Sequence, residues 1–269
     1  MASFLEPIRV IINGALGRMG QEIAKAVVSE PGLRAVGAVD KEVTQKYLPL
    51  AEAPELILLC SDLGSCLKSC DADVVVDFTN AEVSMAAARI AMKQKINMVI
   101  GTTGLSEENL AEIARLCQTH KVGAVVAPNF SLGAALMIRL SKFAAKFFNH
   151  AEIVEMHHDE KADAPSGTAI ATAKAMAQAR GKPFIHPETA REVLSNTRGG
   201  EMDGIALHSL RLPGFMAGQE VVFSGAGETL SLRHNTISRE CYVPGVILAI
   251  KEVTKRKGLT YGLDALLKL

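Results

Sequence analysis

The chain has 269 residues, and its composition, 48% hydrophobic and 22% charged, is that of an ordinary globular protein with a sizeable core. Lysine plus arginine and aspartate plus glutamate number 29 each, so no net positive charge exists to attract nucleic acid or an anionic membrane surface. The length allows one large α/β domain or two smaller ones.

The N-terminal residues carry no sign of a targeting segment. MASFLEPIRV lacks a basic region followed by an apolar one, so we expect no signal peptide. The longest apolar stretch, residues 122–138, is interrupted by Pro128 and Asn129 and is too short to span a bilayer. The five cysteines are odd in number, scattered and without a CxxC pair, which is typical of reduced thiols. We therefore expect a cytoplasmic protein with no membrane partner.

The N-terminal half alternates short β-rich runs with helical patterns, as parallel βαβ units do. The predicted strands are residues 9–13, 33–40, 74–79, 96–100 and 123–127. The predicted helices are residues 21–29, residues 81–95 and a helix that begins after Ser106. Ser106 is a good N-cap for this last helix, and Glu107 and Glu108 lie near its positive dipole end.

The pattern changes after residue 130. A long helix is predicted over residues 132–148, a strand over 151–157, a helix over 166–180, long strands within 204–234 and a final helix over 243–256. This order predicts a Rossmann-type parallel sheet formed by residues 1–130 and 241–269, which would be a dinucleotide-binding domain. Residues 131–240 would form a second, inserted α+β domain built on a mixed β-sheet. The final helix is expected to pack on the first domain.

A glycine-rich turn follows the first predicted strand, where Gly14, Gly17 and Gly20 form a GxxGxxG spacing. Glycines let the backbone approach a pyrophosphate, whose charge then meets the N–H groups of a helix N-terminus. Because the spacing differs from GxGxxG, the turn alone also fits a structural turn without a ligand. Asp40 ends the second strand about 20 residues later, where an acidic residue can bond an adenosine ribose. Together these features predict a nicotinamide dinucleotide site.

The residues near Asp40 leave the choice of cofactor open. Asp40 favours NADH, because an acidic residue accepts a hydrogen bond from a free 2′-hydroxyl. Lys41 and Arg18 could instead pair with the 2′-phosphate of NADPH. We expect both cofactors to work, with a lean toward NADH.

A second dense motif, EMHHDEKADAPSGTA, occupies residues 155–169. It places His157, His158 and Lys161 at the exit of a strand and then begins a helix at Ser166, which can cap it. Histidine titrates near neutral pH, which suits proton transfer. A helix N-terminus beside basic side chains can hold a carboxylate. The motif therefore predicts a site that binds an anion and moves a proton.

The start of this helix has both a functional and a structural interpretation. The N–H groups of Gly167 and Thr168 would point toward whatever lies in front of the helix. A solvated lysine and a histidine pair that merely ends a strand are the structural alternatives, but proton donors gathered at an anion-binding helix start are hard to explain by packing. Zinc is disfavoured because no third ligand has a suitable spacing, so we expect no metal.

Both motifs resemble one family, the dihydrodipicolinate reductases, also called 4-hydroxy-tetrahydrodipicolinate reductases. The likeness covers nearly the whole chain and follows the family's order, and the segment 155–169 is highly specific to the family. The other similar segments are residues 14–20, 77–79, 101–104, 127–131 and 204–221.

The resemblance implies a homotetrameric enzyme that reduces a small unsaturated or hydroxylated tetrahydrodipicolinate with NADH or NADPH, in the diaminopimelate route to lysine. Residues 131–240 would bind the substrate and form the oligomer. His157 would be the general acid/base residue and Lys161 the proton donor. The substrate carboxylates would be bound by His158, Lys161, Ser166, Gly167 and Thr168. The cofactor would be bound by Gly14, Ala15, Leu16, Gly17, Arg18, Met19, Asp40, Lys41, Gly101, Thr102, Thr103, Ala127, Pro128, Asn129 and Phe130.

Several alternatives stay open at this point. The substrate could be another small cyclic imine or carbonyl dicarboxylate, and either His157 or Lys161 could deliver the proton. An acylating semialdehyde dehydrogenase would need an activated cysteine, yet neither Cys117 nor Cys241 lies in a glycine-rich turn. A redox sensor that binds DNA would need a helix-turn-helix module and a basic face, and we find neither.

Overall fold

The computed structural model describes residues 6–51, 53 and 55–267, which divide into two units by their internal contacts. One unit holds the described residues up to Leu132 and those from Arg239 onward. The other unit is Gly133–Ser238. Both limits lie close to the boundaries predicted from the sequence, while the roles given to the two domains remain predictions.

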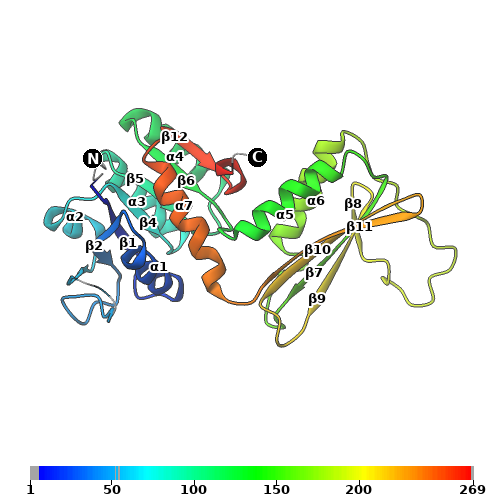
Figure 1. The fold of residues 1–269 in the computed structure, drawn as a ribbon, viewed down its shortest axis with the longest axis horizontal. Helices are drawn as coiled ribbons and strands as arrows, with labels where there is room; N and C mark the ends of the chain where they lie inside the picture. Colours follow the sequence, from blue (N-terminus) through cyan, green and yellow to red (C-terminus); the bar gives the residue numbers. More distant parts are fainter. Residues whose placement is uncertain (1–5, 52, 54, 268–269) are drawn as a thin grey trace. The chain divides into compact units, whose positions relative to one another are not determined.

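The first unit contains a parallel sheet whose strands run in the order β12-β6-β5-β4-β1-β2-β3 (Figure 1). The strands are β1 (Ile8–Asn13), β2 (Leu33–Val39), β3 (Leu58–Cys60), β4 (Val74–Asp77), β5 (Asn97–Ile100), β6 (Gly123–Val126) and β12 (Gly258–Tyr261). The order of the strands reverses between β1 and β4. Sheets of this kind bind ligands outside the carboxyl ends of their strands, at the point of reversal.

Helices and two short 3-10 turns cover this sheet. They are α1 (Arg18–Ser29), α2 (Leu63–Ser69), α3 (Ala81–Lys93), α4 (Glu107–His120), α7 (Val243–Val253), η1 (Arg239–Tyr242) and η2 (Asp264–Leu266). α1 contacts α7, and α3 contacts α4. Ser106 caps α4 in a capping box with Asn109, so the predicted start of this helix is confirmed. The contact of α7 with α1, β5 and β6 places the final helix on the first unit, as predicted.

Three elements of this unit, β3, α2 and β12, are not predicted by the sequence patterns. The strands are three and four residues long, and α2 has seven residues. β3 and α2 contain too few repeats for a hydrophobic period to be recognised. β12, with the sequence GLTY, is as long as β4, which was predicted, but it lacks the run of three valines in β4. The C-terminal segment therefore supplies an edge strand to the sheet as well as the predicted helix.

The second unit contains a mixed sheet with the strand order β11-β10-β7-β9-β8 (Figure 1). Its strands are β7 (His150–His157), β8 (Gly200–Met202), β9 (Ile205–Arg211), β10 (Ala217–Gly225) and β11 (Glu228–Thr236). β7 and β9 are parallel, and the other neighbours are antiparallel. Residues of α5 (Leu132–Ala144) and α6 (Gly167–Arg180) share one apolar core with the inner face of this sheet. The predicted fold class is therefore confirmed.

The helix predicted over residues 132–148 ends earlier, at Ala144. Arg180, at the end of α6, donates to the carbonyl oxygens of Ala145 and Phe148. These carbonyls are therefore bonded by a side chain from another helix and do not continue the helical ladder. The prediction was wrong in its C-terminal limit because apolar periodicity does not report such a bond.

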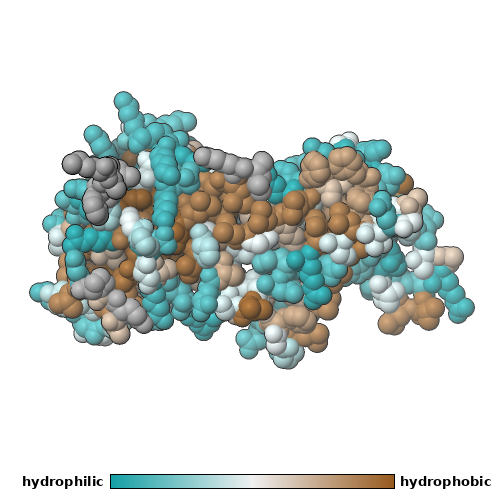
Figure 2. Space-filling model, viewed as in Figure 1, coloured by the Kyte–Doolittle hydropathy of each residue, from teal (hydrophilic) through white to brown (hydrophobic). Residues whose placement is uncertain are grey.

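The surface of α5 is rich in apolar side chains (Figure 2). Leu136, Leu140 and Phe143 are all exposed, and their spacing of three to four residues places them along one stripe of the helix. The helix thus presents apolar residues on its outer side as well as toward the core. Among the residues that the structure describes, no helix is long and apolar enough to cross a membrane.

Candidate active site

The glycine turn after β1 lies at the reversal point of the parallel sheet. Gly14 has a φ of +82°, and a Cβ on it would lie 2.9 Å from the carbonyl oxygen of Phe78. Gly20 packs on the same turn, because a Cβ there would lie only 2.0 Å from the Gly14 oxygen. The first and third glycines of the motif therefore serve the turn and the close approach of α1 to it.

The start of α1 offers uncapped N–H groups. Gly17 is the N-cap residue in an extended conformation, and no side chain caps the helix. The first N–H groups of a helix lack partners within the helix, and the positive end of its dipole favours an anion. Gly17 and Arg18 are exposed, whereas Ala15 is buried and Leu16 and Met19 are partly buried. The turn thus fits a pyrophosphate.

Asp40 follows β2 and contacts the turn directly. Its Oδ2 accepts the N–H of Leu16 at 2.9 Å, and its Oδ1 accepts the N–H of Glu42 at 3.3 Å. The Asp40 carboxylate thereby stabilises the glycine turn, and its contact with a ribose hydroxyl stays a prediction. The Lys41 side chain is 88% exposed and its ammonium lies 3.9 Å from Glu42, so its charge stands in solvent beside Asp40.

A cavity of about 540 Å³ lies in front of the turn. Five of the predicted cofactor residues line this cavity: Gly14, Leu16, Gly17, Asp40 and Lys41. It is also lined by Phe78 and Thr79 of the similar segment 77–79, and by residues that the sequence did not single out, which include Ser61, Asp62, Asn80, Val83 and Ile90. Val83 and Ile90 belong to α3 and are exposed apolar residues. Apolar residues on the side of α3 that faces away from the core are a sequence signal that could have identified Val83 and Ile90.

The predicted segments after β5 and β6 meet the end of β4. A Cβ on Gly101 would lie 2.2 Å from the ring of Phe78, and the rings of Phe78 and Phe130 are 5.6 Å apart. Thr102 is buried, and the Asn129 side chain accepts the N–H of Ser131 at 2.8 Å. Ala127 is buried, while Thr103 and Pro128 are exposed. None of these predicted residues lines the cavity described above, although all lie at the same edge of the sheet.

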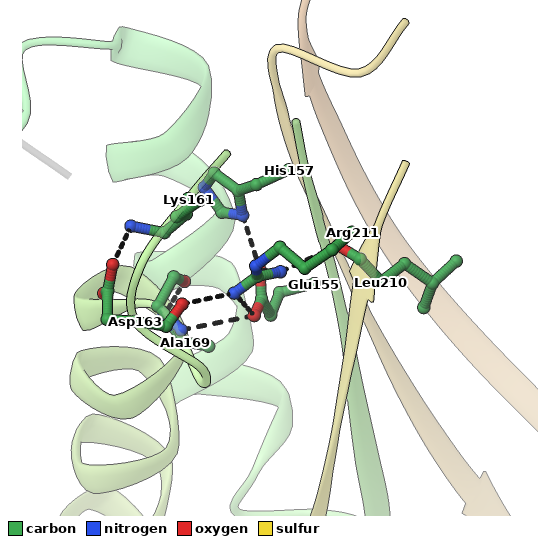
Figure 3. Close-up of polar contacts among 8 residues, drawn as sticks. Glu155, His157, Lys161, Asp163, Ala169, Leu210 and Arg211 are labelled. Atoms are coloured by element: carbon green, nitrogen blue, oxygen red, sulfur yellow. Dashed lines mark hydrogen bonds and ion pairs between the residues drawn. The ribbon is translucent and has the colours of Figure 1, made fainter. Parts of the chain in front are cut away.

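The second motif places its side chains at the end of β7 and the start of α6 (Figure 3). Ser166 is the N-cap residue of α6 and accepts the N–H of Ala169 at 3.2 Å, which confirms the predicted helix start. A Cβ on Gly167 would meet nothing within 4 Å, so the helix start is open on that side. Thr168 is partly buried, and His158 is exposed.

Glu155 is the centre of the polar contacts around this motif (Figure 3). Its side chain is 1% exposed, and Arg211 of β9 bonds both oxygens, at 3.1 and 2.7 Å. The N–H of Ser166 donates to Oε1 at 3.3 Å. Burial raises the pKa of Glu155, but hydrogen bonds from Arg211, Ser209 and His157 outweigh burial and leave the pKa below its ordinary value. The buried group is therefore a carboxylate.

His157 is oriented by this carboxylate. Its Nδ1 lies 2.5 Å from Oε2 of Glu155, so in the neutral ring Nδ1–H donates to Glu155 and Nε2 carries the lone pair. Burial lowers the pKa of His157, and the nearby Lys161 and Arg211 lower it further, while Glu155 raises it. The net pKa lies below the ordinary value of 6.5, so the ring is neutral at neutral pH.

Lys161 is held in the loop between β7 and α6. Its Nζ lies 2.5 Å from Asp163, and Arg211 donates to the Asp163 carbonyl at 2.7 Å. One arginine therefore binds both the carboxylate beside His157 and the loop that carries Lys161. Two cations, a neutral imidazole and a helix start suit an anionic substrate that must receive a proton. The sequence did not indicate Arg211, which is paired with His157 only through the register of β7 and β9.

Two of the rival chemistries can be compared with the structure. Among the described residues, no group of three or more His, Cys, Asp or Glu side chains could hold a metal ion. Burial raises the pKa of the Cys117 thiol to about 11, so this thiol is a poor nucleophile at neutral pH. The acylating alternative therefore finds no support at Cys117.

A parallel sheet with a glycine turn at its reversal point, joined to a unit with a proton-transfer motif, defines a Rossmann-type, NAD(P)H-dependent oxidoreductase. Residues 8–130 match the sequence profile "Dihydrodipicolinate reductase, N-terminus", and residues 133–267 match its C-terminal counterpart. The chain belongs to the dihydrodipicolinate reductase family, which confirms the family inferred from its motifs.

Individual relatives agree with this family. The chain is 51% identical to a 4-hydroxy-tetrahydrodipicolinate reductase of Dehalococcoides mccartyi, over 98% of this chain and 100% of that protein. It is 47% identical to the enzyme of that name from Moorella thermoacetica, over 97% and 98% of the two chains. A dipicolinate-bound dihydrodipicolinate reductase from Paenisporosarcina sp. TG-14 superposes with a TM-score of 0.88 at 37% identity, over 97% and 100%. An amine dehydrogenase from Mycobacterium smegmatis, at 16% identity, shares the fold alone, with a TM-score of 0.65 over 97% and 96%.

Proposed function

We propose that the chain is a 4-hydroxy-tetrahydrodipicolinate reductase, which uses NADH or NADPH to form tetrahydrodipicolinate in the diaminopimelate route to lysine. The arrangement of Glu155, His157 and Lys161 at the open start of α6 is the observation that carries this proposal. It combines an oriented proton-transfer group with a place for carboxylates, in a chain of the reductase family.

The first unit would hold the cofactor. Residues 14–19 offer the turn and the uncapped helix start for the pyrophosphate, and Asp40 would accept a ribose hydroxyl. Lys41, which is exposed next to Asp40 in the chain, would pair with the 2′-phosphate of NADPH. Residues 101–103 and 127–130, at the same sheet edge, would complete the nicotinamide side of the site. When bound, NADH or NADPH supplies the hydride.

The second unit would hold the dicarboxylate. The N–H groups of Gly167 and Thr168, with Ser166 as the N-cap, form the positive start of α6 and would bind one carboxylate. Lys161 and Arg211, together with the exposed His158, would bind the other carboxylate. Since a Cβ on Gly167 would meet no atom within 4 Å, a carboxylate can approach this backbone closely.

The donor of the proton can be inferred from the protonation and hydrogen bonds of His157 and from the position of Lys161. His157 is neutral at neutral pH, and its Nδ1–H is used by Glu155, so Nε2 accepts a proton and has none to give. Lys161 carries an ammonium group on the loop beside it. We therefore assign proton donation to Lys161, with His157 as the group that relays or accepts a proton at Nε2.

The test is the oxidation of NADH and of NADPH at 340 nm, with the substrate generated in place from pyruvate and aspartate semialdehyde by a synthase. Oxidation that depends on the synthase is the expected result. The ratio of kcat/KM for the two cofactors then measures the preference around Asp40 and Lys41. A folded protein that binds NADH and oxidises neither cofactor under these conditions contradicts the substrate assignment.

The assembly and the location of the enzyme are also proposals. We infer a homotetramer formed through the second unit, since its sheet has a helix-covered face and a second face on which Val154 and Val222 are only partly buried. Light scattering after gel filtration would give the mass. The cysteines of the described residues form no disulfides, which suits the reducing cytoplasm.

A further inference from the structure

A second buried carboxylate lies in the first unit, at the carboxyl end of β4. Asp77 is 0% exposed and pairs in the sheet with Asn13 of β1 on one side and Ile100 of β5 on the other. β1 and β4 flank the point at which the strand order reverses. Asp77 is therefore placed beneath the region in which sheets of this kind bind their ligands.

Both oxygens of Asp77 accept hydrogen bonds from neutral donors. Oδ2 accepts the side-chain amide of Asn13 at 2.5 Å. Oδ1 accepts the hydroxyls of Thr79 at 2.9 Å and Thr102 at 2.8 Å. The hydroxyl of Ser84 also donates to Oδ1, and it lies 2.8 Å from the Thr102 hydroxyl. One carboxylate thus gathers four side chains.

These partners come from four different segments of the cofactor unit. Asn13 ends β1 directly before the glycine turn, Thr79 follows β4, and Thr102 follows β5, whereas Ser84 lies in α3. Asn13 and Thr79 also line the cavity in front of the turn. A displacement of Asp77 would therefore move the walls of the cavity and the segment after β5 together.

The buried side chain of Asp77 at the end of β4 costs folding free energy. The other residues of β4, Val74–Val76, are apolar and buried, as expected for a central parallel strand. Burying a polar side chain is costly, and hydrogen bonds only offset that cost. An apolar residue would serve the core alone, so the presence of Asp77 calls for a reason beyond packing.

We propose that Asp77 is a positioning residue of the cofactor site, which holds the glycine turn after β1 in register with the segments after β4 and β5. Only then can one dinucleotide bind its pyrophosphate at the turn and its nicotinamide half at the neighbouring strand ends. The inference rests on the proposed use of NADH or NADPH. Asp77 itself touches no reacting atom in this role.

The test is the affinity for NADH and for AMP in an Asp77→Asn variant, measured by fluorescence and calorimetry without substrate. Asparagine keeps the shape, but it has one acceptor oxygen where Asp77 offers two, and it lacks the negative charge on which the four donors converge. With weaker hydrogen bonds in the Asp77→Asn variant, the turn and the segments after β4 and β5 must be ordered when NADH binds. This should raise the NADH dissociation constant about tenfold, the equivalent of one hydrogen bond to a charged group. AMP needs only the outer part of the site near Asp40, so its dissociation constant should change less than twofold.

A second variant covers the case in which Asp77→Asn does not fold. Ser84→Ala removes one donor from the carboxylate, and Ser84 does not line the cavity. We expect about threefold weaker NADH binding, the size of one modest hydrogen bond. Ser141→Ala is the matched control, because Ser141 is also fully buried and its hydroxyl has no hydrogen-bond partner in the described structure. It should leave NADH affinity unchanged.

Three outcomes would overturn the proposal. The first is a folded Asp77→Asn variant whose NADH affinity stays within twofold of that of the unmodified chain. The second is an equal loss of NADH and AMP affinity, which would indicate a general loss of structure. The third is an equal response to Ser84→Ala and Ser141→Ala. Since substrate is absent, failure here is distinct from failure of the reductase assay.

Discussion

The candidate residues of the two units are arranged in different ways. In the first unit, the residues come from the ends of several strands, and the turn at Gly14 and Gly17 offers backbone N–H groups and space. In the second unit, nearly all of the side chains to which we assign a role lie in residues 155–168, and Arg211 bonds two residues of this segment, Glu155 and Asp163. With the proposed roles, binding of the cofactor would depend mainly on shape, and binding and protonation of the substrate would depend mainly on charge. Substitutions in one unit should therefore affect one ligand and spare the other.

The largest expected effect is the loss of turnover in Lys161→Ala. Removal of the proton donor should lower kcat about 1000-fold, within the usual range for general acid catalysis. NADH affinity should stay unchanged, because Lys161 belongs to the second unit. Steady-state rates and a fluorescence titration check the two halves of this prediction. Lys182→Ala, an exposed lysine of the same unit, is the control. A variant that keeps a tenth of its turnover would remove Lys161 from the mechanism.

For Gly17→Val we expect the opposite result, a loss of NADH binding. A branched side chain at the start of α1 would occupy the space of the pyrophosphate and weaken NADH binding about 100-fold. A Cβ on Gly17 lies 3.2 Å from the Gly14 oxygen, and one on Gly64 lies 3.3 Å from Asp62, so Gly64→Val is a control of similar crowding. Full NADH binding by the Gly17 variant, measured by fluorescence, would show that the pyrophosphate does not lie at this turn.

A smaller effect, on substrate alone, is expected for Gly167→Ala. The added methyl group meets no protein atom within 4 Å, so the fold should be unaffected, but it would stand between the helix start and a carboxylate. The KM for the dicarboxylate should rise about tenfold, the equivalent of one weakened charged contact. Gly200→Ala is the matched control, since a Cβ there also meets nothing. Equal KM values for the two variants would argue against carboxylate binding at α6.

The electrostatic character of the second unit can be tested by pH. The pKa of His157 lies below 6.5, so the folded protein binds fewer protons than the unfolded chain as pH falls through the interval below 6.5. The contribution of His157 to stability is therefore present at neutral pH and decreases in that interval. Glu155→Gln removes the charge that opposes burial and should move the titration of His157, followed by NMR, to lower pH. A shift to higher pH would mean that Glu155 does not hold this ring.

The smallest effect is expected at the rim of the first unit. Lys41→Ala should weaken NADPH binding by a factor of about five and leave NADH binding nearly unchanged, because an exposed lysine contributes a modest, salt-screened attraction to a phosphate. Titrations with both cofactors at low salt measure the difference. An equal change for NADH and NADPH would exclude Lys41 from cofactor selection.

The parts of the molecule that can be predicted from the sequence are those encoded by neighbouring residues. The turn at Gly14 and the N-caps Ser106 and Ser166 combine a residue type with a fixed spacing, so each is recognisable in a few residues. β3 is too short to show a period, and β12 lacks the apolar run that marks β4, although both lie in the sheet of the first unit. Their places depend on contacts with strands elsewhere in the chain.

The interactions that could not be predicted join residues through strand register. Arg211 reaches Glu155 because β9 lies beside β7, and Asp77 reaches Thr102 because β5 lies beside β4. Nothing near these residues in the sequence specifies the partner. Both carboxylates are buried, and although each lies in a segment recognised from the sequence, 155–169 or 77–79, its hydrogen-bond partners are known only from the structure.

The interrupted course of the first unit has a consequence for synthesis on the ribosome. The chain leaves this unit at Leu132 and returns at Arg239, and the edge strand β12 pairs with β6 through contacts such as Leu259 with Ala124. While the nascent chain emerges, the second unit is complete before β12 and α7 have been translated. β6 then keeps an open edge, which is prone to pair with other chains. β12, which is translated after the second unit, covers that edge of β6.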